Sequence, residues 1–94
     1  MTIKNFKGRE TEKVFRNLFS RRLPESIQRV ARRRLRLLDV ATSLNDLAAI
    51  PGNHLEALTK DRKGQHSIRI NRQWRVCFVW KDGQPHNVEI EDYH

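Results

Sequence analysis

The spacing of apolar residues divides the chain into a helical first half and a strand-forming second half. In the first half, apolar positions recur every three or four residues, as in amphipathic helices. Pro24 suits the start of a helix, and Ser43 with Asp46 forms a capping pattern. The elements expected there are a short opening strand over Ile3–Phe6 and helices over Thr11–Phe19, from Pro24 to Ala41, and from Ser43 to the break at Pro51-Gly52.

The second half changes to the two-residue period of β-strands. Apolar and polar residues alternate over Ser67–Asn71, Trp74–Trp80 and Val88–Ile90, and Asp82-Gly83 is typical of a hairpin turn. A further strand is expected around Leu55–Leu58. The pattern predicts an α+β fold, a compact single domain over residues 1–94 in which N-terminal helices pack on one face of a mainly antiparallel sheet.

The register of the first hairpin follows from matching its apolar faces. A three-residue loop at Asn71–Gln73 sets Ile70 opposite Trp74 and therefore Arg69 opposite Arg75. Two like charges in this position destabilise a sheet by about 0.2–1 kcal/mol, so a bound anion would relieve them. The alternative is that both arginines simply keep an exposed face solvated.

The second hairpin is expected to extend this row. Pairing Trp80 with Val88 and Phe78 with Ile90 matches the apolar faces and places Tyr93 beside Arg75. We therefore expect Arg69, Arg75 and Tyr93 to form an exposed row on the face opposite the helices.

The charge of the chain points to a polyanion or an acidic protein as partner. It has 19 basic and 11 acidic residues, a net charge of +8, of which +7 lies in residues 1–50 and +1 in residues 51–94. The candidate contacts with RNA or the ribosome are Arg29, Arg32, Arg33, Arg36, Arg62 and Lys63. Arginines on one helix face can also serve only to solvate it, and this alternative stays open.

Several classes of protein are not favoured. The single Cys77 allows no internal disulfide, and the four histidines show no zinc-binding spacing, so no cofactor or metal is expected. The apolar runs are short and the opening residues lack the apolar core of a secretory signal. We expect a cytoplasmic protein with no membrane partner.

Three segments resemble the HigB branch of the RelE/ParE toxin superfamily: Pro51–Glu56, Asp61–Trp80 and Val88–His94. The resemblance implies a RelE-like fold, ribosome-dependent cleavage of messenger RNA, and neutralisation by a HigA-type helix-turn-helix antitoxin. It differs at Lys60, where a glycine is more usual before Asp61. By position, it assigns catalysis to Arg75, Asp92, Tyr93 and His94. Arg69 is added by the sheet argument above, and His54 is a further candidate.

These residue types suit the cleavage of RNA by its own 2′-hydroxyl, which needs a base, cations on the phosphate and an acid. The hypothesis is that Arg69 and Arg75 hold the phosphate, that Asp92 and His94 transfer protons, and that Tyr93 orients the nucleotide. No metal is required. A non-catalytic RNA-binding or ribosome-binding module and a gyrase poison of the ParE type are the alternatives. The terminal Asp-Tyr-His argues against the gyrase poison, although such a terminus can also be a frayed end.

Overall fold

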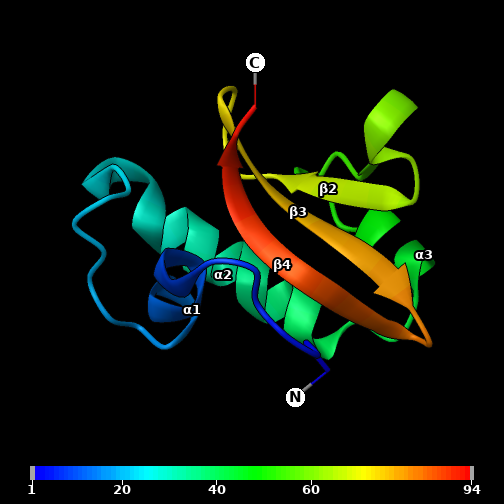
Figure 1. The fold of residues 1–94 in the computed structure, drawn as a ribbon, viewed down its shortest axis with the longest axis horizontal. Helices are drawn as coiled ribbons and strands as arrows, with labels where there is room; N and C mark the ends of the chain where they lie inside the picture. Colours follow the sequence, from blue (N-terminus) through cyan, green and yellow to red (C-terminus); the bar gives the residue numbers. More distant parts are fainter. Residues whose placement is uncertain (1, 94) are drawn as a thin grey trace.

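The computed structural model describes residues 2–93, with helices in the first half of the chain and strands in the second (Figure 1). The helices are α1 (Arg9–Phe15), α2 (Glu25–Val40) and α3 (Leu44–Ala48). After them come strand β1 (Glu56–Ala57), the short 3-10 helix η1 (Lys60–Arg62), and strands β2 (Gln65–Arg69), β3 (Trp74–Lys81) and β4 (Gln84–Asp92).

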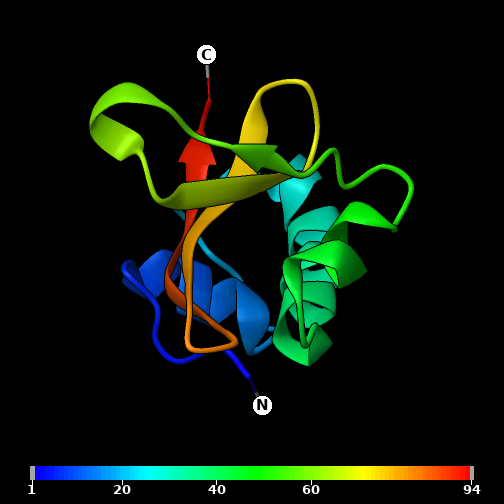
Figure 2. The same ribbon diagram turned by 90° about the vertical axis from the view of Figure 1, so that its right-hand side faces the viewer.

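The four strands form one antiparallel sheet in the order β1-β2-β3-β4. Helix α2 lies against one face of the sheet, where it contacts β3 and β4, and α1 packs against α2 and β4 (Figures 1 and 2). Figure 2 shows α3 on the same side as α2. The expected α+β class, with helices on one face of an antiparallel sheet, is confirmed.

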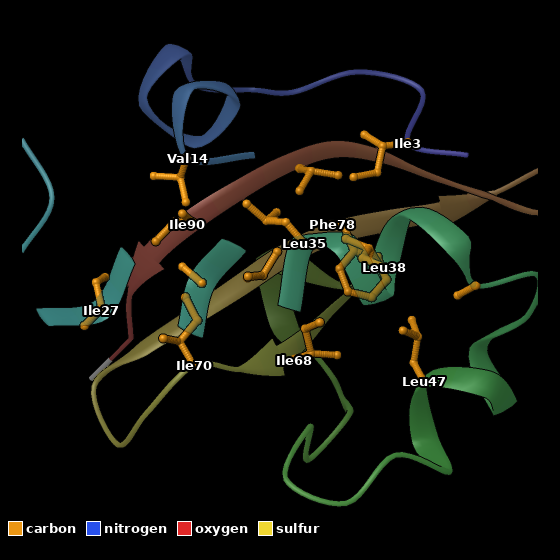
Figure 3. Packing of buried hydrophobic residues seen from close by; sticks show 14 residues of the cluster. Ile3, Val14, Ile27, Leu35, Leu38, Leu47, Ile68, Ile70, Phe78 and Ile90 are labelled. Carbon is orange, nitrogen blue, oxygen red and sulfur yellow. The ribbon is translucent and has the colours of Figure 1, made fainter. Parts of the chain in front are cut away.

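The core fills the space between α2 and the sheet (Figure 3). Leu35 and Leu38 of α2 are fully buried, as are Ile68 and Val76 of the strands. The apolar positions of α2 and of its C-cap face this core: Val30 is half-buried, and five others are buried, namely Ile27, Ala31, Leu35, Leu38 and Ala41. None of the helices within residues 2–93 is long and apolar enough to cross a membrane.

The opening segment is not the strand that the sequence predicts. It runs alongside β4 in the parallel direction, with a single bridge between Phe6 and Val88. The Lys4 and Lys7 amides donate to carbonyls of β4 at 2.9 and 3.0 Å, so the segment covers the outer edge of that strand. Ile3 still reaches the core, with 4% of its surface exposed.

Helix α1 is also shorter than predicted, because it ends at Phe15 rather than Phe19. Asn17 has a φ of 62°, the left-handed conformation that commonly terminates helices. The chain turns there, and Leu18 and Phe19 remain 56% and 61% exposed instead of entering the core. The third helix begins as expected, since the Ser43 side chain accepts from the Asp46 amide at 3.2 Å.

The first hairpin has the predicted register. Arg69 pairs with Arg75 and Ile68 with Val76, and the Ile70 amide donates to the Trp74 carbonyl at 2.9 Å. The strand expected around Leu55–Leu58 is present as the two-residue β1, which pairs with β2.

The second hairpin differs from its predicted register by two residues. The sequence predicts Phe78 opposite Ile90 and Trp80 opposite Val88, but the residue opposite Ile90 is Val76. A shift of two residues leaves each side chain on its predicted face and changes only its neighbours.

The turn and a bulge explain this shift. Asp82 and Gly83 both have positive φ, at 55° and 73°, which gives a tight two-residue turn that pairs Lys81 with Gln84. The ladder is then irregular between Cys77 and Val79. An alternating pattern does not reveal such a bulge, because the extra residue interrupts the period on one strand only.

Candidate active site

The face of the sheet opposite α2 carries the polar row that the sequence places there. Arg69, Arg75 and Glu91 are successive partners across β2, β3 and β4. Tyr93 follows Glu91 by two residues and shares its face. Arg69 is half-buried. Glu91 therefore occupies the position opposite Arg75 that was expected for Tyr93.

Arg75 is buried, with 8% of its surface exposed, so the expectation of an exposed guanidinium is wrong. Its Nε donates to Ser67 Oγ at 2.6 Å, and its Nη2 donates to the carbonyl oxygens of His54 and Ser67 at 2.5 and 3.3 Å. The Tyr93 ring covers the guanidinium, with 5.7 Å between the ring centroid and Cζ. Carbonyl dipoles and an aromatic face thus stabilise this cation within the protein, and no bound anion is needed to relieve it.

Tyr93 reaches across the sheet from β4 to β1. Its backbone amide donates to the Gln73 carbonyl at 2.6 Å, and its hydroxyl donates to Glu56 Oε1 at 3.0 Å. The hydrogen bond to Glu56 raises the pKa of Tyr93, partial burial and the charge of Glu56 add to this, and Arg75 opposes it. The phenol therefore keeps its proton near neutrality and acts as a donor.

The segment before β1 is fixed to the sheet and to two helices by backbone and side-chain bonds. The carbonyl of the fully buried Asn53 accepts from the Arg69 amide at 2.6 Å. Its side chain donates to the Leu47 carbonyl at 3.1 Å and accepts from Arg34 Nη1 at 2.9 Å. His54 has a φ of 44° and an exposed side chain. The contact between His54 and Arg75 thus uses the His54 backbone carbonyl, not the imidazole that the sequence suggested as a candidate.

The last described residues divide between the two faces of β4. Asp92 is exposed, pairs with Trp74, and so lies on the opposite side of β4 from Tyr93. Its Oδ2 accepts from Gln73 Nε2 at 3.0 Å. His94 lies outside the described residues. The structure therefore brings Tyr93 over Arg75 and places Asp92 on the opposite side of the strand.

The loop before β2 is held on the same open face by an ion pair. Arg62 of η1 donates to both Glu91 oxygens, at 2.8 and 2.7 Å, and to Gln65 at 2.8 Å. Bonding to Glu91 raises the pKa of Arg62. Lys63 next to it is exposed. Of the two basic residues expected to bind RNA here, Arg62 is engaged with Glu91 and Lys63 is solvated.

The arginines of α2 form a separate group on the helical side of the molecule. Arg29, Arg33 and Arg36 are exposed, and Arg32 is half-buried. They border a shallow hollow along the helix. A second hollow lies where Arg29 and Arg32 meet the exposed pair Leu18 and Phe19. The candidate RNA contacts therefore fall on two different faces.

Other reactive groups contribute little to this face. Burial raises the pKa of the Cys77 thiol to about 12, so the thiol stays protonated and is a poor nucleophile. Residues 2–93 contain no group of three or more His, Cys, Asp or Glu side chains placed to hold a metal ion.

Two residues that complete the cluster, Glu56 and Ser67, are not among the candidates that the sequence suggests. Ser67 lies two residues before Arg69 and so on the same face, a position that could have identified it as a neighbour of Arg75. Glu56 lies in the expected strand over 55–58, but the alternation of residues does not reveal that this strand pairs with β2. The partner of the Tyr93 hydroxyl therefore had no signal in the sequence.

Comparison with known proteins agrees with a RelE-like toxin. Residues 4–94 match the family described as RelE-like toxin of type II toxin-antitoxin system HigB. Toxin HigB-1 of Vibrio cholerae is 40% identical over 73 residues, which cover 78% of this chain and 77% of the relative. Endoribonuclease HigB of Proteus vulgaris is 30% identical over 93 residues, covering 98% and 99%. The chain belongs to the HigB-like toxin family.

The contacts of Arg75 lead to a first prediction, about stability. Arg75→Ala should lower the free energy of unfolding by about 1–3 kcal/mol, because it leaves Ser67 and the His54 carbonyl without their charged donor. Urea denaturation followed by tryptophan fluorescence measures this. Arg72→Ala, in the exposed loop between β2 and β3, is the control and should change stability little. Equal stability of the two variants would contradict the structural role given to Arg75.

The Tyr93–Glu56 bond leads to a second prediction, about pH. Because the pKa of Tyr93 is raised, its phenolate should form at a higher pH than that of free tyrosine. The chain has a single tyrosine, so the near-ultraviolet absorbance of the phenolate reports on Tyr93 alone. Glu56→Gln should lower the midpoint, since it removes the negative charge, whereas Glu25→Gln on α2 should not. A midpoint unaffected by Glu56→Gln would refute the contact.

Proposed function

We propose that this toxin is an endoribonuclease that cuts messenger RNA on the ribosome, using acid/base chemistry of its own side chains and no metal. The observation that carries the proposal is the Tyr93 ring stacked on the buried Arg75 beside Arg69, on the open face of the sheet. The Proteus vulgaris relative named as an endoribonuclease, which aligns over nearly the whole chain, supports the reaction class.

The arrangement suits attack by a ribose 2′-hydroxyl on the adjacent phosphate. Arg69 is the more accessible guanidinium and is proposed to hold the phosphate oxygens in a bidentate manner. Arg75 lies under the Tyr93 ring and supplies positive charge next to the phosphate. Its hydrogen bonds to Ser67 and His54 use Nε and Nη2. Tyr93, whose hydroxyl donates to Glu56, offers its ring edge to orient a nucleotide. Asp92 and His94, at the end of the chain, are proposed to transfer protons.

The partners follow from the family and the charge. A type II toxin has a cognate antitoxin, which we propose is a HigA-type helix-turn-helix protein. A net charge of +8 favours rapid association with an acidic inhibitor and with ribosomal RNA. We propose that the arginines of α2 contact ribosomal RNA while the open face receives the message, and that the protein works in the cytoplasm.

A third prediction concerns the reaction. The full chain should cut a message on translating ribosomes and leave the same message intact without ribosomes. A single 2′-deoxy nucleotide on the 5′ side of the cut should block cleavage there, because the attacking hydroxyl is missing. A chain lacking residues 92–94 should lose cleavage but retain Val88 and Ile90, and so its core. Mapping of new RNA ends measures cleavage in each case, and circular dichroism shows whether the truncated chain is folded.

The same experiment separates the alternatives. Growth arrest without new RNA ends would favour a non-catalytic module that binds RNA or the ribosome. DNA damage would favour a gyrase poison. Cleavage by the folded, truncated chain at the full rate would exclude the chain end from the chemistry.

A fourth prediction concerns the α2 arginines. Arg32→Glu with Arg33→Glu should weaken ribosome binding and reduce the slope of log affinity against log salt by about 0.7–0.9 for each phosphate that the protein no longer neutralises. Arg21→Glu with Arg22→Glu makes the same charge change in the exposed loop before α2 and is the matched control. Ribosome sedimentation at several salt concentrations measures the slope. If the two double variants behave alike, only overall charge matters and the α2 arginines are a solvated face.

A further inference from the structure

Arg34 of α2 differs from its neighbours Arg33 and Arg36, because its guanidinium contacts the protein interior. Arg33 and Arg36 are exposed, whereas Arg34 is half-buried. Its Nη1 donates to the side-chain oxygen of the fully buried Asn53 at 2.9 Å. Its Nη2 lies against Gly52, 3.1 Å from the position that a Cβ on this glycine would occupy. Arg34 therefore connects α2 to the segment that leads into β1.

The contacts of this cation only partly offset the free energy cost of its burial. Burial and the charge of Arg33 lower the pKa of Arg34. Its Nε is buried and has no hydrogen-bond partner among residues 2–93, and the partner of Nη1 is a neutral amide. An apolar side chain of similar length would stabilise such a site as well or better. We therefore expect Arg34 to serve the geometry of the segment rather than its stability.

Asn53 connects α2 to the open face of the sheet. Its Nδ2 donates to the Leu47 carbonyl at 3.1 Å, and its backbone carbonyl accepts from the Arg69 amide at 2.6 Å. The next residue, His54, has a φ of 44°, which costs free energy for a residue with a side chain and persists only where the surroundings hold it. The His54 carbonyl is the acceptor for Arg75 Nη2. The position of Asn53 therefore affects both arginines that are proposed to act on the phosphate.

We propose that Arg34 is a positioning residue for RNA cleavage, an inference that rests on the proposed function. Through Asn53 it fixes the His54 carbonyl that aligns Arg75. It also fixes the backbone from which Arg69 extends. Because Arg34 lies on the helical side of the sheet, it does not touch the RNA at the cut. Its loss should slow the chemical step and leave ribosome binding intact, the reverse of what is expected for the exposed arginines of α2.

The first test is Arg34→Met, which keeps the apolar stem of the side chain and removes the guanidinium. The kcat of message cleavage on ribosomes should fall by about 10- to 10²-fold with little change in KM, as expected when reacting groups are misplaced by about 1 Å. The melting temperature should be unchanged or higher, because an apolar side chain replaces a partly buried cation. Arg21→Met, the same exchange in the exposed loop before α2, is the control and should change neither kcat nor KM.

The titration of Tyr93 gives a second measurement, which needs no ribosome. Arg75 lowers the pKa of Tyr93, against the opposite effect of Glu56. If Arg75 moves away from the ring in Arg34→Met, the midpoint of the phenolate absorbance should rise. Arg33→Met removes the same charge from the adjacent, exposed position of α2 and should raise the midpoint less. Equal midpoints in the two variants would overturn the proposal.

A second variant covers the case in which Arg34→Met does not fold. Arg34→Lys keeps the charge, but an ammonium cannot both bond to Asn53 and cover Gly52 as the guanidinium does. Its kcat should lie below that of the unmodified toxin. An undiminished kcat in folded Arg34→Lys would then refute the role of Arg34.

The outcomes separate this inference from the proposed function. If the unmodified toxin does not cut messages on ribosomes, the proposed function fails, although the Tyr93 titration still shows whether Arg34 positions Arg75. If the toxin cuts them and folded Arg34→Met has the same kcat, only the role of Arg34 is refuted. A raised KM with an unchanged kcat would also refute it and make Arg34 a ribosome contact.

Discussion

The hydrogen bonds of the Arg75 guanidinium connect the parts of this toxin that form its open face. The guanidinium lies under the Tyr93 ring, beside Ser67, and reaches the His54 carbonyl on the segment that leads into β1. One side chain thus links β3 to β2, to the end of β4 and to the start of β1. A cation with carbonyl oxygens and an aromatic ring as neighbours is stabilised although it is almost removed from water.

The buried Asn53 extends this connection to the other side of the sheet. It contacts α2 through Arg34, α3 through the Leu47 carbonyl and β2 through the Arg69 amide. The position of segment 53–54 is therefore fixed by α2 and α3 on one side of the sheet and by Arg75, a catalytic candidate, on the other. A movement of the helices would shift Asn53 and the adjacent His54, and so the carbonyl that Arg75 binds. This coupling needs no direct contact between α2 and the open face.

Local patterns predicted the elements and the faces of the strands, and they failed where a contact depends on the third dimension. The capping pattern at Ser43 and the loop at 71–73 act within a few residues, so both were predicted correctly. The bulge between Cys77 and Val79 shifted the register of the second hairpin. The left-handed conformation of Asn17 ended α1 earlier than predicted. The burial of Arg75 and the hydrogen bond between Tyr93 and Glu56 depend on side chains from separate strands that meet on the open face, which no local pattern encodes.

The edges of the sheet restrict how another chain can bind here. Residues 4–7 cover the outer edge of β4 from Pro85 to Val88, and the opposite edge of the sheet is the two-residue β1. An exposed strand edge is the usual template for pairing with a foreign strand, and neither edge offers a long run of unpaired backbone groups in the described chain. An inhibitor of this toxin is therefore expected to recognise side chains rather than extend the sheet. Its specificity is thereby determined by surface residues, which can diverge between related toxins while the backbone of the fold stays the same.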